Sequence, residues 1–209
     1  MACILAAPYA QGVWQGMDES LEKALLDMEA QDQALRNELT AAGALNDNKY
    51  HPRLEELHRA NASRLRRIIA VFGWPGITLV GDKGAKAAWR IGLHSISEPP
   101  FMRQCRDLLE HASEASDAPR WQFAIIDDRI RVYEGRPQRY GTQLRVGANG
   151  LEPYPLENEA RVSSMRAQAG LPPMAKTIAL ARAQPQLSIA DQAARDAADL
   201  EFRRTVGWV

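Results

Sequence analysis

Two short polar segments near the middle of the chain carry most of its chemically capable side chains. They are Asp127-Asp128-Arg129 and, a few residues later, Gln138-Arg139-Tyr140-Gly141-Thr142-Gln143. Amide, hydroxyl, phenol and guanidinium groups bind polar ligands through directional hydrogen bonds, and a carboxylate next to an arginine can transfer or hold a proton. The sequence therefore predicts a site here. Asp128 is its candidate catalytic residue, and the candidate ligand-binding residues are Arg129, Gln138, Tyr140 and Gln143.

His94 is the second candidate for proton transfer. It follows Arg90 by one helical turn in a segment that is otherwise apolar and rich in small residues. An imidazole exchanges protons near neutral pH, so we expect His94 and Asp128 to form the proton-transfer pair if the protein is an enzyme. A lone histidine on such a face is more often a hydrogen-bonded core residue, and that alternative stays open.

A structural interpretation also competes for the acidic doublet and for the arginines. Asp127 and Asp128 can tie their own helix to the 138–143 loop by ion pairs without any catalytic purpose. Helical geometry predicts that one of the two carboxylates faces the core while the other faces water. Further on, Arg161 is a candidate for holding an anionic group, together with Arg166 on the same expected helix, although solvated surface arginines are the default.

Metal binding and cofactor chemistry are not predicted. Glu55 and His58 have the Glu-x-x-His spacing of di-iron bundles, but such a site needs two of these units and two further carboxylates, and the sequence contains one unit only. His51 and His94 form no i,i+4 pair with another histidine. The sequence contains no P-loop, dinucleotide-binding glycine motif, nucleophile elbow or His-Glu-x-x-His motif. We expect no metal and no cofactor.

The composition of the chain limits the kinds of partner that we expect. Lys and Arg together number 26, as do Asp and Glu, so no net charge attracts a nucleic acid. No apolar stretch has the length that spans a bilayer. Cys3 and Cys105 lack the spacing of a zinc knuckle, although a single disulfide bond between them stays open. The expected partner is a small polar molecule or a peptide, and the oligomeric state stays open.

Hydrophobic periodicity predicts a mainly α fold: a multi-helix single domain with a small β-hairpin near residues 142–154. Helices are expected at 17–43, 52–72, 83–96, 101–115, 157–169 and 188–205, with a short one after Pro172-Pro173. Residues 120–134 fit a helix or a strand, and we favour the helix because their neighbours are helical. The hairpin turns at Asn149-Gly150. The apolar stripe of the first helix consists of Leu21, Leu25, Met28, Leu35 and Leu39.

Three segments are expected along the chain. Residues 1–16 are an apolar N-terminal arm or the remnant of a secretory signal, residues 17–183 are the helical core domain with the hairpin, and residues 184–209 are a C-terminal helical appendage. Trp208 is a candidate for docking the C-terminus on the domain. The protein is expected to be cytoplasmic, or exported to the periplasm if the N-terminus is a truncated signal.

Several short elements also resemble a known family. They are Gly73-Trp74-Pro75, Ala87-Ala88-Trp89, His94, Gln104, Asp128-Arg129, Gln138-x-Tyr140-Gly141-Thr142-Gln143 and Gly170-Leu171. Over roughly Asp32 to Leu171 the chain resembles a bacterial family known only as a domain of unknown function. The resemblance supports the place of the site and implies nothing about the reaction. Leu93 stands where that family often has glutamine, which weakens the case for a paired Gln-His contact. Members with secretion signals occur, which favours export.

Two functions from different classes follow. The first is a pocket made by His94, Asp128, Arg129, Gln138, Tyr140 and Gln143 that binds a small polar ligand, with cofactor-free hydrolysis or group transfer by acid–base catalysis. The alternative is a non-catalytic interaction module whose polar cluster is scaffolding and whose long N-terminal helices contact a partner. In an enzyme these side chains line one wet cavity, whereas in a scaffold they satisfy one another.

Overall fold

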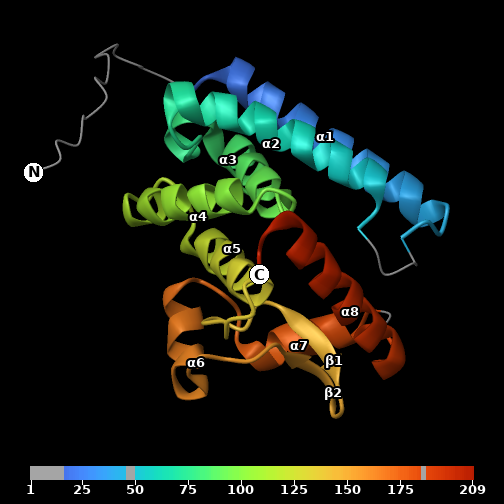
Figure 1. Cartoon of the computed structure of the whole chain (residues 1–209). Helices are drawn as coiled ribbons and strands as arrows, with labels where there is room; N and C mark the ends of the chain where they lie inside the picture. Colours follow the sequence, from blue (N-terminus) through green and yellow to red (C-terminus); the bar gives the residue numbers. More distant parts are fainter. Residues whose placement is uncertain (1–16, 46–49, 185–186) are drawn as a thin grey trace, which may run out of the picture.

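Residues 17–45, 50–184 and 187–209 are described by the computed structural model (Figure 1). The predicted N-terminal arm and Cys3 lie outside these ranges. Within them, the mainly α fold with one antiparallel hairpin is confirmed. None of the described helices combines the length and the apolar character that crossing a membrane requires.

Two long helices lie side by side at one end of the molecule (Figure 1). α1 (Glu19–Ala41) begins at Asp18, whose carboxylate accepts hydrogen bonds from the backbone N–H groups of Ser20 and Leu21. α2 (Pro52–Phe72) begins with a proline, which loses no hydrogen bond in a first turn, and ends before Gly73. Both helices agree with their predicted ranges within two residues, because the signals that start and stop them are local.

The third helix begins earlier than predicted. α3 (Ile77–His94) contains a break at Gly81, where φ is 67°, and the range 83–96 covers only the part after that break. Its first turn is capped from a distant segment: the Asp117 carboxylate accepts a 2.7 Å hydrogen bond from Thr78 N, and the Asp117 carbonyl accepts one from Ile77 N. A cap supplied by residues so far away in sequence leaves no local signal.

α4 (Pro99–Glu114) and α5 (Arg120–Tyr133) pack against α3 and against each other. The predicted start of α4 at Phe101 was two residues late, since Pro99 and Pro100 occupy the first turn. The helical alternative for residues 120–134 is confirmed. Side chains from α1 to α5 fill the core, with Leu25, Met28, Leu65, Val80, Met102, Leu109, Ile126 and Ile130 almost wholly buried.

The hairpin and the last helices occupy the other end of the molecule (Figure 1). β1 (Leu144–Gly147) pairs antiparallel with β2 (Gly150–Pro153), which confirms the hairpin, but its loop is Ala148-Asn149, one residue before the predicted Asn149-Gly150, and Gly150 begins β2 with a φ of 93°. They are followed by α6 (Glu159–Gln168), α7 (Met174–Arg182) and α8 (Ile189–Val206).

α8 is joined to the rest of the domain at both of its ends. Gln192 accepts a 3.1 Å hydrogen bond from Val146 N of β1, and Arg203 donates a 2.8 Å hydrogen bond to Val132 O of α5. The indole of Trp208 is buried and donates to Ile96 O at 2.7 Å. The segment predicted as an appendage, 184–209, therefore contributes α8 as a wall of the domain, and Trp208 docks the C-terminus.

Candidate functional site

Three helices each contribute one polar side chain to the point where they meet. Asp32 of α1 accepts hydrogen bonds from His58 Nε2 of α2 at 2.9 Å and from His94 Nδ1 of α3 at 2.6 Å. Arg36, one turn after Asp32, donates to the same carboxylate at 2.9 Å. The Tyr50 hydroxyl is hydrogen-bonded to Nδ1 of His58. We call Asp32, His58 and His94 the Asp32 cluster.

The hydrogen bonds of the Asp32 cluster determine where its protons lie. Burial by itself raises the pKa of Asp32, but the hydrogen bonds from His58 and His94 outweigh it and hold that pKa well below its usual range. Burial lowers the pKa of His94 to about 4, although the hydrogen bond to Asp32 opposes this change. At neutral pH, therefore, Asp32 is charged and His94 is neutral. Since Nδ1 of His94 donates to Asp32, its Nε2 carries a lone pair.

A cavity of about 740 Å³ lies beside His94. This volume is within the range, roughly 300–1,000 Å³, of sites that bind small molecules. The walls come from α1, α2 and α3 on one side and from α5, the hairpin and α8 on the other. Among the lining residues are Arg36, Tyr50, His58, His94, Arg129, Tyr133, Gln143, Tyr154, Asp199 and Phe202.

Three of the residues singled out in the sequence line this cavity together: His94, Arg129 and Gln143. Arg129 donates from Nε to Gln143 Oε1 and from Nη1 to the carbonyl oxygen of Leu93, each at 3.3 Å. Burial lowers the pKa of Arg129, yet a guanidinium stays charged in proteins. The structure therefore brings the predicted imidazole, guanidinium and one predicted amide to the same space.

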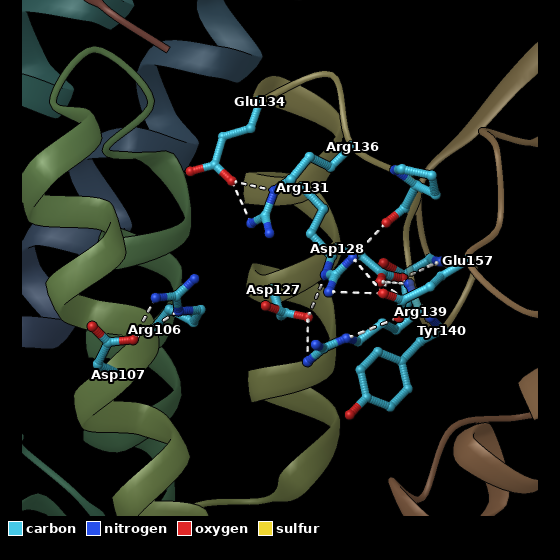
Figure 2. A network of polar contacts seen from close by, with 12 residues as sticks. Arg106, Asp107, Asp127, Asp128, Arg131, Glu134, Arg136, Arg139, Tyr140 and Glu157 are labelled. Atoms are coloured by element: carbon cyan, nitrogen blue, oxygen red, sulfur yellow. Dashed lines mark hydrogen bonds and ion pairs between the residues drawn. The ribbon is translucent and has the colours of Figure 1, made fainter. Parts of the chain in front are cut away.

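Asp128 does not line the cavity and lies instead behind the 138–143 loop (Figure 2). Its carboxylate is fully buried and accepts hydrogen bonds from the backbone N–H groups of Arg139 at 2.7 Å, Tyr140 at 3.1 Å and Thr142 at 2.9 Å. Burial raises the pKa of Asp128, and these three hydrogen bonds oppose it. Asp128 holds the loop in place, and the structure does not bring it to the wall that His94 lines.

Gln138, Tyr140 and Arg161 also lie away from the cavity lining. Gln138 is fully buried, donates to the carbonyl oxygens of Gln143 at 3.0 Å and Tyr154 at 2.8 Å, and accepts from Gln143 N. The Tyr140 side chain packs in the hydrophobic core, and Arg161 is exposed on α6. Gln138 and Tyr140 thus shape the loop that carries Gln143.

The prediction that one carboxylate of the acidic doublet faces water is wrong. Asp127 is as buried as its neighbour and lies 3.4 Å from Arg131 and 3.8 Å from Arg139 (Figure 2). Burial raises the pKa of Asp127, against the effect of these two arginines. Arg139 belongs to the loop, so the ion pair ties α5 to the 138–143 segment, as the structural interpretation of the doublet expected.

The sequence prediction missed Asp32 and did not connect His58 with His94. Asp32 follows Leu25 by seven residues and Met28 by four, so it occupies the apolar stripe of the first helix. A carboxylate on a buried stripe is unfavourable unless it is paired, which makes it a signal for a polar cluster. His58 follows the buried Leu54 by four residues, so it occupies the buried stripe of the second helix in the same way.

The Asp32 cluster also has the donor atoms of a metal site. One donor atom from each of its three residues lies within 4.8 Å of the others, and two imidazoles with one carboxylate are a known ligand set for divalent ions. Arg36, however, already neutralises the single carboxylate. A divalent ion added there would place two further positive charges beside Arg36 with no carboxylate left to balance them, which is unfavourable. The donor atoms of a metal site are therefore in place, but the negative charge that would hold a divalent ion is already taken up by Arg36.

Comparisons with known proteins give one match. No curated protein and no solved structure matches the chain. A family described as of unknown function matches residues 19–189, which include the Asp32 cluster, Arg129 and Gln143 and end where α8 begins. The chain therefore belongs to the family of unknown function DUF6624.

Proposed function

We propose that this protein is an enzyme that hydrolyses a small polar molecule, or transfers a group from it, with His94 as the general base and without a metal. The observation that supports this most is the 2.6 Å hydrogen bond between Asp32 and His94 at the wall of the cavity. It fixes the imidazole in one tautomer, with the lone pair on Nε2. A histidine that is neutral and oriented in this way can accept a proton.

In the proposed reaction, Nε2 of His94 takes a proton from a water molecule or from a hydroxyl group of the second substrate. The oxygen then forms a bond to the electrophilic carbon or phosphorus of the substrate, and the imidazolium returns the proton to the leaving group as the old bond breaks. Asp32 stabilises the imidazolium, as the aspartate of a Ser-His-Asp triad does. His58 donates to the other oxygen of Asp32 and so holds the carboxylate in position.

The non-catalytic alternative explains the positions of two predicted site residues, Asp128 and Gln138. Asp128 and Gln138 are satisfied by the loop that they support, as expected for scaffolding. It does not account for a buried aspartate that orients an imidazole at the edge of a large cavity. The enzyme proposal therefore rests on Asp32 and His94 and needs no catalytic role for Asp128.

The test is turnover by the purified full chain of a panel of nitrophenyl carboxylic esters, anilides and phosphate esters, in buffer containing a metal chelator. For any substrate that is turned over, His94→Gln is expected to lower kcat/KM by about 10²–10⁴-fold, the usual contribution of a general base. His111→Gln is the matched control, because its side chain on α4 is 78% exposed. It should leave turnover unchanged.

Asp32→Asn tests the orienting role. It is expected to lower kcat with little change in KM, whereas Asp27→Asn, an exposed aspartate on the same helix that pairs with Lys23, should have no effect. Turnover by His94→Gln at the wild-type rate would refute the proposal. So would activity that the chelator abolishes and a divalent ion restores, because the cluster would then act through a metal.

A further inference from the structure

No carboxylate in the described part of the chain forms an ion pair with Arg129. Both of its hydrogen bonds go to neutral oxygens, the side-chain amide of Gln143 and the backbone carbonyl of Leu93. Across residues 17–45, 50–184 and 187–209, no Asp or Glu oxygen lies within 4.0 Å of its guanidinium. Arg129 is half-buried, and a charge that is partly withdrawn from water without an ion pair is unfavourable.

The two fully buried arginines, Arg131 and Arg166, have more partners than Arg129, although Nε of Arg131 makes no hydrogen bond. Arg131 lies against the carboxylates of Asp127 and Glu157 and donates to Pro137 O at 2.7 Å. Arg166 donates to the carbonyl oxygens of Pro172, Tyr140 and Gly141 and to a threonine hydroxyl. Of the five N–H donors that a guanidinium has, Arg129 uses two within the described residues, one on Nε and one on Nη1. Its remaining donors are on Nη1 and Nη2, the end that can bind a ligand.

Arg129 lines the same cavity as His94 of the Asp32 cluster. The guanidinium lines the cavity and is hydrogen-bonded to Leu93, the residue directly before His94. Asp199 of α8 lines the same cavity; burial raises its pKa, and the positive charges of Arg195, Arg203 and Arg129 oppose that change. Asp199 and Arg129 attract each other, but their charged atoms are farther apart than the 4.0 Å of an ion pair, so Asp199 leaves the hydrogen-bond donors of Arg129 unoccupied.

The geometry points to Arg129 as the binding site for the carboxylate of a small molecule whose remaining atoms reach His94. The two terminal nitrogens of a guanidinium match both oxygens of a carboxylate. Of the other two arginines that line the cavity, Arg36 is paired with Asp32 and Arg195 lies near Asp199, so Arg129 is left to neutralise one negative charge and a carboxylate fits better than a phosphate dianion. Aromatic rings of Tyr50, Tyr133 and Tyr154 line the same cavity and favour a ligand with an apolar body. This inference rests on the proposed function and names its substrate class: carboxylic acids that also carry a hydrolysable or transferable group.

The experiment is an NMR titration of the full chain with three probes of one shape: benzoate, benzamide and phenyl phosphate. Benzoate is expected to shift resonances of residues that line the cavity and to bind at least about tenfold more tightly than benzamide, since a hydrogen-bonded charge contributes that much. Arg129→Gln should weaken benzoate binding about tenfold or more. Arg64→Gln is the control, because Arg64 is exposed on α2 and does not line the cavity.

Arg129→Lys provides a second variant if the glutamine variant does not fold. It keeps the charge and loses the paired donors, so benzoate should bind with intermediate affinity. Benzoate binding that is absent in the wild type, equal in Arg129→Gln or no tighter than benzamide binding would overturn the inference, and tighter binding of phenyl phosphate would overturn the choice of carboxylate. A protein that binds benzoate through Arg129 but turns over no ester would contradict the proposed catalysis alone.

Discussion

Two arginines on α5, two positions apart, lie in opposite surroundings. Arg131 is buried against Asp127 and holds the start of the 138–143 loop through Pro137 O. Arg129 faces the cavity and has only neutral partners among the described residues. We infer that the first arginine stabilises the fold and that the second is kept for a ligand.

The two arginines should therefore respond differently to the same substitution. Arg131→Met removes one of the two arginines beside the buried Asp127 and the donor to Pro137 O, a change that costs about 1–3 kcal/mol and lowers the Tm of a chain of this length by roughly 2–12 °C. Arg129→Met removes an uncompensated charge, so its Tm should equal or exceed that of the wild type. Thermal unfolding followed by circular dichroism measures both. A fall in Tm for Arg129→Met as large as for Arg131→Met would show that Arg129 is a structural residue.

At the level of single residues, side-chain chemistry alone predicted three of the residues that line the cavity. His94, Arg129 and Gln143 were identified because their side chains can do chemistry, and they line one cavity. Asp32 was missed because its partners are far away in sequence. The acidic doublet attracted attention for its charge, but Asp128 is occupied by backbone N–H groups, whose direction no residue pattern reveals.

The 138–143 loop is an element whose shape depends on one side chain of the helix before it. Gly141 adopts φ of 66°, which is favourable for glycine, and the backbone N–H groups around it converge on Asp128. The loop also carries Gln143 to the cavity. Asp128 thus acts on the site only by holding the loop.

Asp128→Asn should loosen this loop without abolishing folding. The amide nitrogen cannot accept a hydrogen bond, so at least one backbone N–H loses its acceptor, which costs about 1–3 kcal/mol. Hydrogen exchange at Arg139, Tyr140 and Thr142 should become faster, and Asp107→Asn, at an exposed position on α4, should change none of these rates. Unchanged exchange at all three amides would contradict the supporting role of Asp128.

Elements were predictable where their boundary signals are local. Asp18, Pro52 and Ser188 start α1, α2 and α8 close to where the sequence predicted, and the hairpin turns within one residue of the predicted Asn149-Gly150. The first turn of α3 was not predictable in this way, because its cap is Asp117, from the connection between α4 and α5.

At the scale of the whole molecule, the cavity exists because elements distant in sequence meet. α1, α2 and α3 supply the Asp32 cluster from one end, while the hairpin and α8 close the cavity from the other (Figure 1). Apolar stripes predicted which faces of the helices are buried, but they do not say which helix packs on which. The family match ends at residue 189, so the wall that α8 provides lies almost entirely outside it.

This packing also makes the stability of the folded protein depend on pH. In the folded protein burial lowers the pKa of His94 to about 4, whereas an exposed imidazole titrates near 6.5. As the pH falls from about 6.5 to about 4, the unfolded chain binds a proton at this position before the folded chain does, so the free energy of unfolding decreases over that range. Above about pH 6.5 the His94 imidazole is neutral in both the folded and the unfolded chain, so its titration no longer lowers the free energy of unfolding.

The most direct test of the account is the protonation state of His94 in the intact chain, measured by NMR on ¹⁵N-labelled histidine from pH 8 downward and assigned with His94→Gln. The account predicts a neutral ring with its proton on Nδ1 and a free lone pair on Nε2, which titrates only at about pH 4. A ring that is already charged at pH 6.5, or a proton on Nε2, would contradict the claim that Asp32 presents His94 to the cavity as a base.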